Sequence, residues 1–249
     1  IYYYNIFCFR MTITIKFSDN IEHKYNNFEE IIILDNYDDI ISFCCSFNNL
    51  SNLPKLPNSL KILHCYYNDL YSLPELPNSL EILNCEYNII SSLPKLPNSL
   101  KLLYCYFNSL SSLPELPNSL TKLRCSNNKI SSLPELPNSL EILDCGYNKI
   151  SSLPELPNSS DYLDCSNNNL SSLPELPNSL KLSYYNNNPI YTYIQKYFDG
   201  KTDNYFKYEN DMKKKFVNKI ENWFLECKYN PKYLYCRKRL IKEYEEFYG

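Results

Sequence analysis

The 249-residue sequence predicts a solenoid with a parallel β-sheet on one side and an extended return on the other. Three observations support this prediction. The block Leu-Pro-Glu-Leu-Pro-Asn-Ser-Leu, or its Lys variant, recurs every twenty residues between Leu53 and Leu180, and only Ser160 breaks it. A strand-like alternation follows each block, and helical patterns close the chain. A fixed period of this length is typical of stacked turns that share one core.

Each turn is expected to begin with a short strand. In the turn over residues 60–79, Leu63 and Cys65 alternate with polar or aromatic residues, which is the period-two pattern of a strand with one buried face. Full turns start at Ile40, Leu60, Leu80, Leu100, Leu120, Leu140 and Ser160. A degenerate eighth turn follows, so we expect the solenoid to occupy residues 40–190.

Asparagine and proline define the rest of each turn. Asn68 follows the strand, where its amide can bond backbone groups of adjoining turns, because an unpaired buried amide would be costly. Pro74 and Pro77 fix their own φ and disfavour helix at the residues before them. The convex side is therefore expected to be extended, close to polyproline II.

The cysteines follow the repeat. Of the 11 cysteines, seven occupy one strand position. They are Cys45, Cys65, Cys85, Cys105, Cys125, Cys145 and Cys165. Each is expected to be a small buried apolar group and not half of a disulfide bond. We therefore expect reduced thiols, and with them an intracellular protein.

Residues 1–39 are expected to form an N-terminal segment and cap. Residues 12–17 and 31–34 are strand-like and would cover the first turn. The apolar run at residues 1–9 precedes its charge, which is not the order of a secretory signal. Because the first methionine is Met11, we expect residues 1–10 to lie upstream of the natural start. No run approaches eighteen apolar residues, so no membrane span is expected.

Residues 191–249 are expected to be helical and mildly basic. The helical pattern starts near Asp199, and residues 212–227 place apolar side chains on one face of a helix. Pro231 is well placed to open a second helix, which gives a hairpin. Glutamates are interspersed among the lysines and arginines of this region, so binding of nucleic acid is not favoured.

The turn Leu-x-x-Leu-x-Cys-x-x-Asn-x-Leu, followed by Leu-Pro-x-Leu-Pro, resembles the short, twenty-residue class of leucine-rich repeat, best known from secreted bacterial effector proteins. The resemblance implies a leucine-rich repeat solenoid with a parallel concave sheet that binds other proteins. Some such effectors carry a ubiquitin-ligase domain with a catalytic Cys-x-Asp motif. Cys227 and Cys236 lack that pattern, so ligase activity is not implied.

A second resemblance concerns the C-terminal segment. Residues 219–240 resemble the tails of proteins from giant, mimivirus-like DNA viruses of amoebae, and the bias toward residues with A/T-rich codons fits such an origin. The resemblance implies no activity. It makes a host protein the natural partner, and the host cytoplasm or the virion the natural location.

Two strand columns vary from turn to turn and are expected to face outward from the concave sheet. Early turns are aromatic, with Tyr67, Tyr87 and Phe107 at the edge of the patch, and later turns are charged. Exposed aromatics beside charges are typical of interface anchors, although drift on a permissive surface is the alternative. The predicted protein-binding residues are His64, Tyr66, Glu86, Tyr104, Tyr106, Arg124, Asp144 and Asp164.

The function that follows is a non-catalytic protein-interaction module that needs no cofactor or metal. One alternative is an adaptor whose repeats select a target while the C-terminal helices recruit an effector or an assembly. A remote alternative is an enzyme that uses Cys44 and His64, since imidazole can activate a neighbouring thiol. A flat sheet offers that pair no evident oxyanion donors, and two ligands are too few for structural zinc.

Overall fold

A computed structural model describes the backbone of residues 12–228 and the side chains of residues 12–219. The chain forms two compact units, Ile1–Thr192 and Tyr193–Gly249, which are described separately below. The proposed upstream segment 1–10 and the helix expected after Pro231 lie outside the described residues.

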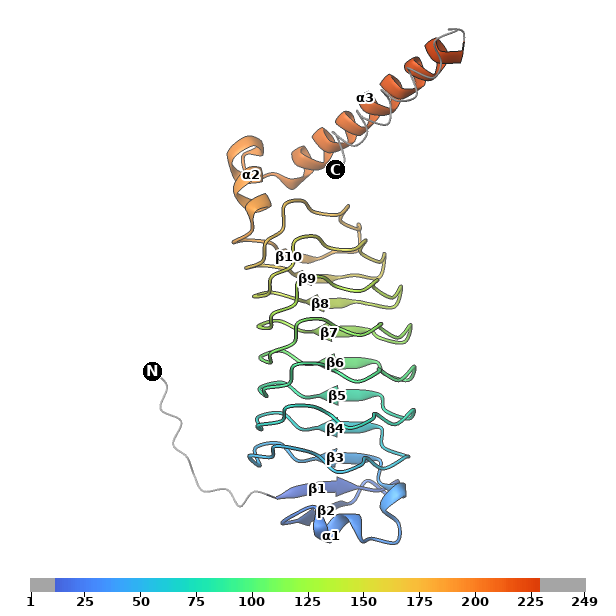
Figure 1. The fold of residues 1–249 in the computed structure, drawn as a ribbon, viewed down its shortest axis with the longest axis vertical. Helices are drawn as coiled ribbons and strands as arrows, with labels where there is room; N and C mark the ends of the chain where they lie inside the picture. Colours follow the sequence, from blue (N-terminus) through green and yellow to red (C-terminus); the bar gives the residue numbers. More distant parts are fainter. Residues whose placement is uncertain (1–11, 229–249) are drawn as a thin grey trace. The chain divides into compact units, whose positions relative to one another are not determined.

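The first unit is a solenoid in which each turn contributes one short strand (Figure 1). Its parallel strands are β3 (Ser42–Cys44), β4 (Ile62–His64), β5 (Ile82–Asn84), β6 (Leu102–Tyr104), β7 (Lys122–Arg124), β8 (Ile142–Asp144), β9 (Tyr162–Asp164) and β10 (Leu182–Tyr184). Neighbouring strands pair in register at a shift of twenty residues, as Leu63 pairs with Leu83. The predicted parallel solenoid is confirmed.

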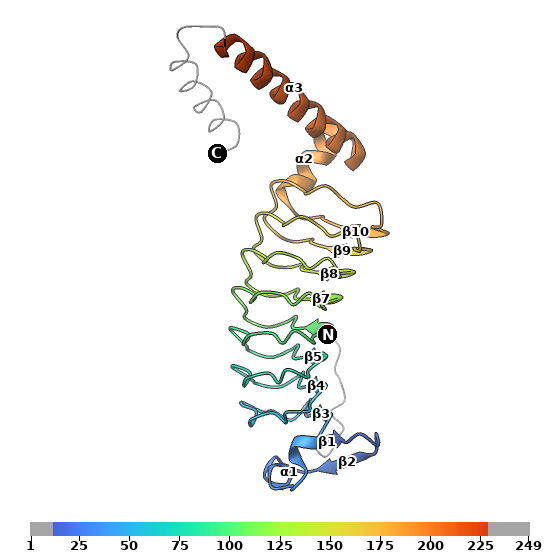
Figure 2. The same ribbon diagram turned by 90° about the vertical axis from the view of Figure 1, so that its right-hand side faces the viewer.

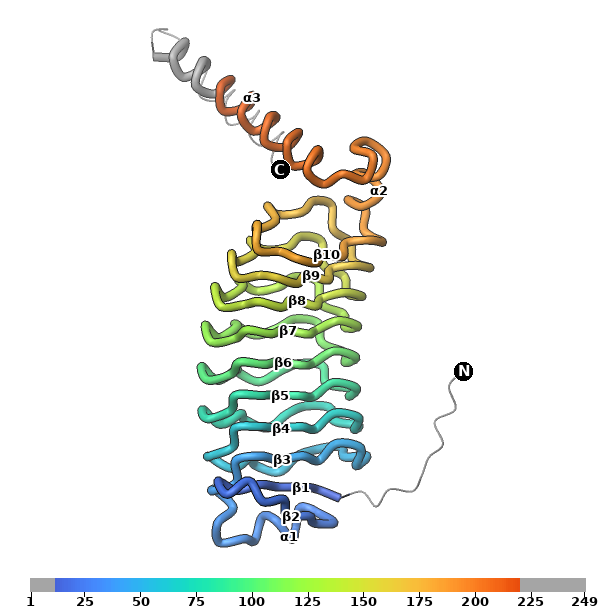
Figure 3. Tube along the Cα trace, turned by 180° about the vertical axis from the view of Figure 1, so that it is seen from behind, coloured from blue at the N-terminus to red at the C-terminus, as the bar shows by residue number. Residues whose placement is uncertain are grey.

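The return side of each turn lies opposite the strands and contains no helix between residues 45 and 181 (Figure 2). The Cα trace passes from one turn to the next in sequence order (Figure 3). The Leu80 N–H donates to the Pro77 carbonyl at 3.1 Å and closes a turn just before the next strand. The extended convex side predicted from the two prolines is therefore confirmed.

Leucine and cysteine side chains fill the interior of the solenoid. Leu63, Leu83 and Leu103 are fully buried, and burial of such a side chain contributes about 1.5–3 kcal/mol. All seven cysteines of the repeat column are also fully buried, and each is a free thiol. The predicted buried column of thiols is confirmed.

The asparagine that follows each strand ties its own turn to the preceding one. The Asn68 amide nitrogen donates to the carbonyls of Cys45 and Cys65, both at 3.0 Å. Its amide oxygen accepts from the backbone N–H of Leu50 at 2.9 Å. The corresponding pattern recurs at Asn88, Asn108, Asn128, Asn148, Asn168 and Asn188. The predicted asparagine ladder is confirmed.

A serine ladder on the return side was not predicted. The Ser79 hydroxyl lies 2.8 Å from the carbonyl oxygen of Asn58 in the preceding turn and 2.7 Å from that of Leu60, the first residue of its own turn. The same contacts recur at Ser99, Ser119, Ser139 and Ser159. These hydroxyls satisfy backbone carbonyls of the return, which has no helical hydrogen bonds of its own.

An antiparallel pair extends the sheet at its N-terminal end. Strand β1 (Ile13–Lys16) pairs with β3 on one side and with β2 (Glu22–Tyr25) on the other. The strand predicted over residues 12–17 is confirmed. The polar sequence of β2 gave no apolar alternation, but it suits an edge strand, where charge discourages further pairing.

The strand predicted over residues 31–34 is wrong, because those residues lie in or directly after helix α1 (Glu29–Ile32). The Asn27 amide oxygen accepts from the Glu30 N–H at 3.0 Å, and its nitrogen donates to the Glu30 carboxylate at 3.1 Å. These bonds stabilise the first helical turn, where acidic side chains are also favourable. A one-turn 3-10 helix, η1 (Tyr37–Asp39), leads into the solenoid.

The C-terminal helical structure begins at Pro189, ten residues before the predicted position near Asp199. Helix α2 (Pro189–Phe198) starts at a proline, whose fixed φ suits the first helical position. Gly200, with φ of 72°, separates it from α3 (Thr202–Lys228), which includes the helix predicted over residues 212–227. Within the second unit, the Phe198 ring contacts Tyr205 and Tyr208. None of the described helices is long and apolar enough to cross a bilayer.

Candidate protein-binding surface

The predicted binding residues lie in two columns of the concave sheet. Five of them end strands β4, β6, β7, β8 and β9; they are His64, Tyr104, Arg124, Asp144 and Asp164. Tyr66, Glu86 and Tyr106 follow two residues after β4, β5 and β6. Arg124 is exposed and most of the others are half-buried, but Glu86 is only 9% exposed. Glu86 therefore supports the surface from within and does not project from it.

A third concave column was missed. It lies two residues before the strand ends, and its members are half-buried. They are Ile62, Ile82, Leu102, Lys122, Ile142 and Tyr162. The period-two alternation that placed His64 on the outer face applies to them equally. Their near-uniform aliphatic character in the early turns concealed them among core residues.

The early turns carry a stack of rings that we call the aromatic ladder, formed by Phe47, Tyr67, Tyr87 and Phe107. Successive ring centroids lie 4.7, 4.1 and 4.5 Å apart, with interplanar angles of 11°, 10° and 11°. Tyr106 packs edge-on against the Tyr87 ring at 5.6 Å. The ladder therefore continues the concave aromatic patch around its edge.

Each ladder residue adopts a left-handed backbone conformation. Tyr67 and Tyr87 have φ of 52° and 50°, whereas the equivalent position in a later turn is Asn127, with φ of 54°. This conformation costs a non-glycine residue roughly 1–2 kcal/mol, and asparagine tolerates it best. Stacked ring pairs contribute about 0.5–1.5 kcal/mol each, which is enough to offset that cost within the ladder.

The ladder predicts opposite outcomes for one substitution at two equivalent positions. Tyr87→Asn removes two stacked contacts and is expected to destabilise the solenoid by about 1–2 kcal/mol. Tyr147→Asn is expected to be neutral or stabilising, because Tyr147 has the same backbone conformation, is 58% exposed and has no ring contact among the described residues. Urea unfolding of both variants measures the difference. Equal losses would show that stacking contributes nothing.

Glu86 is a buried carboxyl group between two aromatic turns. It forms hydrogen bonds with the side chains of Tyr106 and Asn84, which favour its charged form. Burial outweighs these bonds and raises the pKa of Glu86. Burial and the hydrogen bond to Glu86 likewise raise the pKa of Tyr106. This network fixes the orientation of the Tyr106 ring on the surface.

The later turns carry the charged part of the surface. The Arg124 guanidinium carbon lies 5.7 Å from the centroid of the Tyr104 ring, within the range of a cation–π contact. Asp144 and Asp164 are register partners on β8 and β9. The Asp144 carboxylate accepts from the Ser126 hydroxyl at 3.1 Å. Burial, followed by repulsion from Asp164, raises the pKa of Asp144.

Asp144→Asn is expected to stabilise the solenoid at pH 7 and not at about pH 3. A carboxyl whose pKa is raised by folding disfavours the folded state once it is ionised, and this penalty is absent below the pKa of the unfolded chain. The amide keeps the acceptor for Ser126 and removes the repulsion from Asp164. Thermal unfolding at both pH values measures the effect, with Asp69→Asn, at an exposed position, as the control. A gain that does not change with pH would contradict the electrostatic explanation.

Cys44 and His64 are register partners on β3 and β4, as the enzyme alternative requires. The Cys44 thiol lies 4.0 Å from the Ser46 hydroxyl oxygen. The His64 Nδ1 atom is buried without a hydrogen-bond partner among the described residues, and burial lowers the pKa of His64. The Nδ1 atom therefore forms no hydrogen bond with the Cys44 thiol. Within the described residues, no group of three or more His, Cys, Asp or Glu side chains is placed to hold a metal ion.

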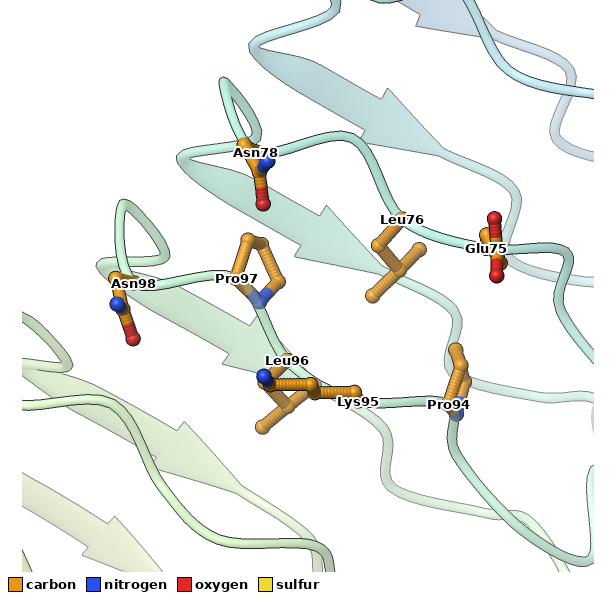
Figure 4. A pocket seen from close by; sticks show the side chains of 8 residues that line it. All are labelled: Glu75, Leu76, Asn78, Pro94, Lys95, Leu96, Pro97 and Asn98. Carbon is orange, nitrogen blue, oxygen red and sulfur yellow. The ribbon is translucent and has the colours of Figure 1, made fainter.

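Shallow grooves occur between successive returns on the convex side. One groove, of about 480 Å³, is lined by Pro94, Leu96 and Pro97 of one turn and by Leu76 of the turn before (Figure 4). Equivalent grooves of about 560 and 630 Å³ recur in later turns. The apolar lining residues repeat with the block, and the grooves differ mainly in whether lysine, as at Lys95, or glutamate occupies the charged position.

Comparisons with known proteins agree with this geometry. Residues 118–158 match the family described as Leucine Rich repeats (2 copies). YopM from Yersinia enterocolitica WA-314 is 39% identical, with a TM-score of 0.52; the match covers 61% of this chain and 38% of that protein. YopM from Yersinia pestis, a leucine-rich effector protein, is 33% identical, with a TM-score of 0.53; the match covers 59% of this chain and 49% of that protein.

The matched part thus spans less than half of either YopM chain. No curated protein matches the sequence. Leucine-rich repeat solenoids are typically non-catalytic and generally bind protein partners. The chain therefore contains leucine-rich repeats and is structurally similar to bacterial effector proteins that are built from such repeats.

Proposed function

We propose that the chain is a non-catalytic module that binds a partner protein through the concave face of its solenoid. The observation that carries this proposal is that the concave columns vary from turn to turn, whereas the core column hardly does. The core column of leucine and cysteine hardly changes, whereas the concave columns change from an aromatic half to a charged half on the same sheet. Extended concave faces are the usual binding surfaces of solenoids. The similarity to YopM supports a protein-binding role.

The central residues of this surface are its strongest candidates for energetic anchors. Tyr66, Tyr104 and Arg124 combine rings with a guanidinium, and these residue types dominate hot spots in protein interfaces. Asp144 and Asp164 extend the surface toward the later turns, and Glu86 fixes the Tyr106 ring from beneath. A host protein is the natural partner and an intracellular setting the natural location. The two matched structures are bacterial, so the viral resemblance rests on the C-terminal sequence and the composition.

Replacing the three anchors together tests the proposal. The triple variant Tyr66→Ala, Tyr104→Ala, Arg124→Ala is expected to lose at least about 100-fold in affinity for partners captured by the unaltered chain. The matched control replaces three exposed convex residues, Glu115, Glu135 and Glu155, by alanine. Circular dichroism checks that both variants fold. A concave variant that retains every partner would exclude this face as the binding surface.

An adaptor is the second candidate, because the chain divides into a solenoid unit and a separate C-terminal unit. In that case the solenoid selects a target and the helices recruit an effector or an assembly. Affinity capture with the full chain and with a chain that ends at Thr192 separates the two candidates. Partners recovered only by the full chain support an adaptor, whereas identical sets of partners support the simple binding module.

A further inference from the structure

The aromatic ladder leaves an apolar surface open along four turns. Phe47 is 56% exposed, and Tyr67 and Phe107 are each 43% exposed. Tyr66 packs edge-on against Phe47 at 5.3 Å, and Tyr106 does the same against Tyr87, so the ladder and the concave rings form one continuous aromatic surface. Its position beside the proposed binding columns makes it part of the same interface.

The charges nearest this aromatic surface already have partners within the chain. Arg124 lies over the Tyr104 ring, and Glu86 forms hydrogen bonds with Tyr106 and Asn84. A partner's charge would have to displace these contacts. The aromatic half is therefore best suited to an apolar or aromatic side chain.

The acidic pair further along the sheet is different. Asp144 and Asp164 form no ion pair among the described residues. Asp164 accepts from the Ser166 backbone N–H at 2.9 Å and from the Ser166 hydroxyl at 2.7 Å, and neither donor carries a charge. The Tyr162 ring lies on the same strand face, two residues before Asp164. Arg124 is the register partner of Asp144 and its charge favours the ionised Asp144, but two carboxylates face one guanidinium. The net local charge is therefore negative and lies beside an aromatic ring.

Gly146 packs closely against this pair. Its φ is not in the left-handed region, so its backbone does not require glycine. A Cβ atom there would lie 3.2 Å from an oxygen of the Asp164 carboxylate. A larger residue at this buried position would therefore crowd the Asp164 carboxylate, and glycine avoids that contact.

We propose that the partner presents an extended segment with an apolar side chain against the aromatic rings and a lysine or arginine toward Asp144 and Asp164. Charge complementarity selects the basic residue, and a neighbouring ring favours it further. Tyr104 ends β6 and Asp144 ends β8 in the same column, two strand spacings or about 9.6 Å apart. An extended chain covers that span in about three residues. The favoured segment is therefore apolar-x-x-basic. This inference rests on the proposed function.

Selection from a library of displayed twelve-residue peptides tests the inference on the full chain. The selected peptides are expected to be enriched in a lysine or arginine about three residues from an aromatic or aliphatic residue. Their binding is expected to depend on Tyr66, Tyr104 and Arg124. Peptides that depend on these residues but show no basic preference would overturn the inference and leave the proposed function standing. A library that gives no peptide dependent on the concave face would overturn both.

A cycle of paired substitutions then locates the basic side chain. One synthetic selected peptide and its Lys→Gln or Arg→Gln version are titrated against the unaltered chain and against Asp144→Asn, Asp164→Asn. The double variant Asp144→Asn, Asp164→Asn is expected to lower the affinity for the basic peptide by about tenfold or more. Its affinity for the glutamine peptide is expected to fall by much less. The control variant, Glu155→Gln, Glu175→Gln, makes the same change in charge at exposed convex positions and is expected to leave both affinities unchanged. Equal losses for the two peptides would show that the basic residue binds elsewhere.

Discussion

Asn88→Ala is expected to destabilise the solenoid by about 3 kcal/mol or more. The Asn88 amide nitrogen donates to the carbonyls of Cys65, Cys85 and Glu86 at 3.0–3.1 Å, and its oxygen accepts from the Leu70 N–H at 3.0 Å. Alanine leaves several buried backbone groups without partners, and each such group costs about 1–3 kcal/mol. Urea unfolding followed by circular dichroism measures the loss.

The matched control for this prediction is Asn98→Ala. Asn98 belongs to the same repeating scaffold, but its side chain is exposed on the return side. Its replacement is expected to change the free energy of unfolding by less than about 0.5 kcal/mol. Similar losses of stability at both positions would mean that the hydrogen bonds of the asparagine ladder contribute nothing specific to the free energy of unfolding.

The thiols of the cysteine column are expected to resist alkylation in the folded chain by about a thousandfold or more. Burial raises the pKa of every cysteine in the column, that of Cys165 to about 12 from an ordinary value of 9.0. Because the thiolate is the reactive form, a rise of about three units lowers its population roughly a thousandfold. The buried position of these thiols slows access further.

Iodoacetamide labelling at pH 8, read by peptide mass spectrometry, measures this protection residue by residue. Cys44, which is only half-buried, serves as the internal control and is expected to label before any thiol of the column. In strong denaturant all of these thiols are expected to react at similar rates. Rapid labelling of Cys105 in the native chain would contradict the buried column.

The solenoid was predictable because every turn repeats the same pattern of buried, hydrogen-bonding and helix-excluding residues. Leu63 and Cys65 define the buried face of a strand, Asn68 pairs the backbone beyond it, and Pro74 and Pro77 exclude a helix on the return. Each signal is weak in one turn but reinforced by the others. At residues 31–34 no repeat was available. A short apolar run there fits a strand or a helix equally, and the Asn27–Glu30 contacts decided for a helix.

The concave columns were predictable from the same alternation, but their details were not. The sequence does not show that Glu86 lies beneath Tyr106, because burial there depends on how neighbouring rings pack. The stacking of the aromatic ladder follows from a left-handed backbone position that the sequence pattern marks only indirectly, through Asn127 and the asparagines of later turns. The third column was missed because Ile62 and Ile82 resemble core residues by type.

The asparagine and serine ladders also limit how the gene for such a solenoid can change. Besides local bonds, each asparagine side chain bonds backbone groups 18 and 23 residues before it, and each serine hydroxyl bonds carbonyls 19 and 21 residues before it, about one repeat away. Deleting or duplicating twenty residues therefore rejoins matching partners, whereas an insertion of any other length disrupts both ladders. Unequal recombination between repeats is the compatible route to new variants. Removing residues 100–119 would place Arg124 beside Asn84 and bring the acidic pair one strand closer to Tyr66, with the loss of Tyr104 and Tyr106. Spacing along the concave face can therefore evolve in steps of one turn.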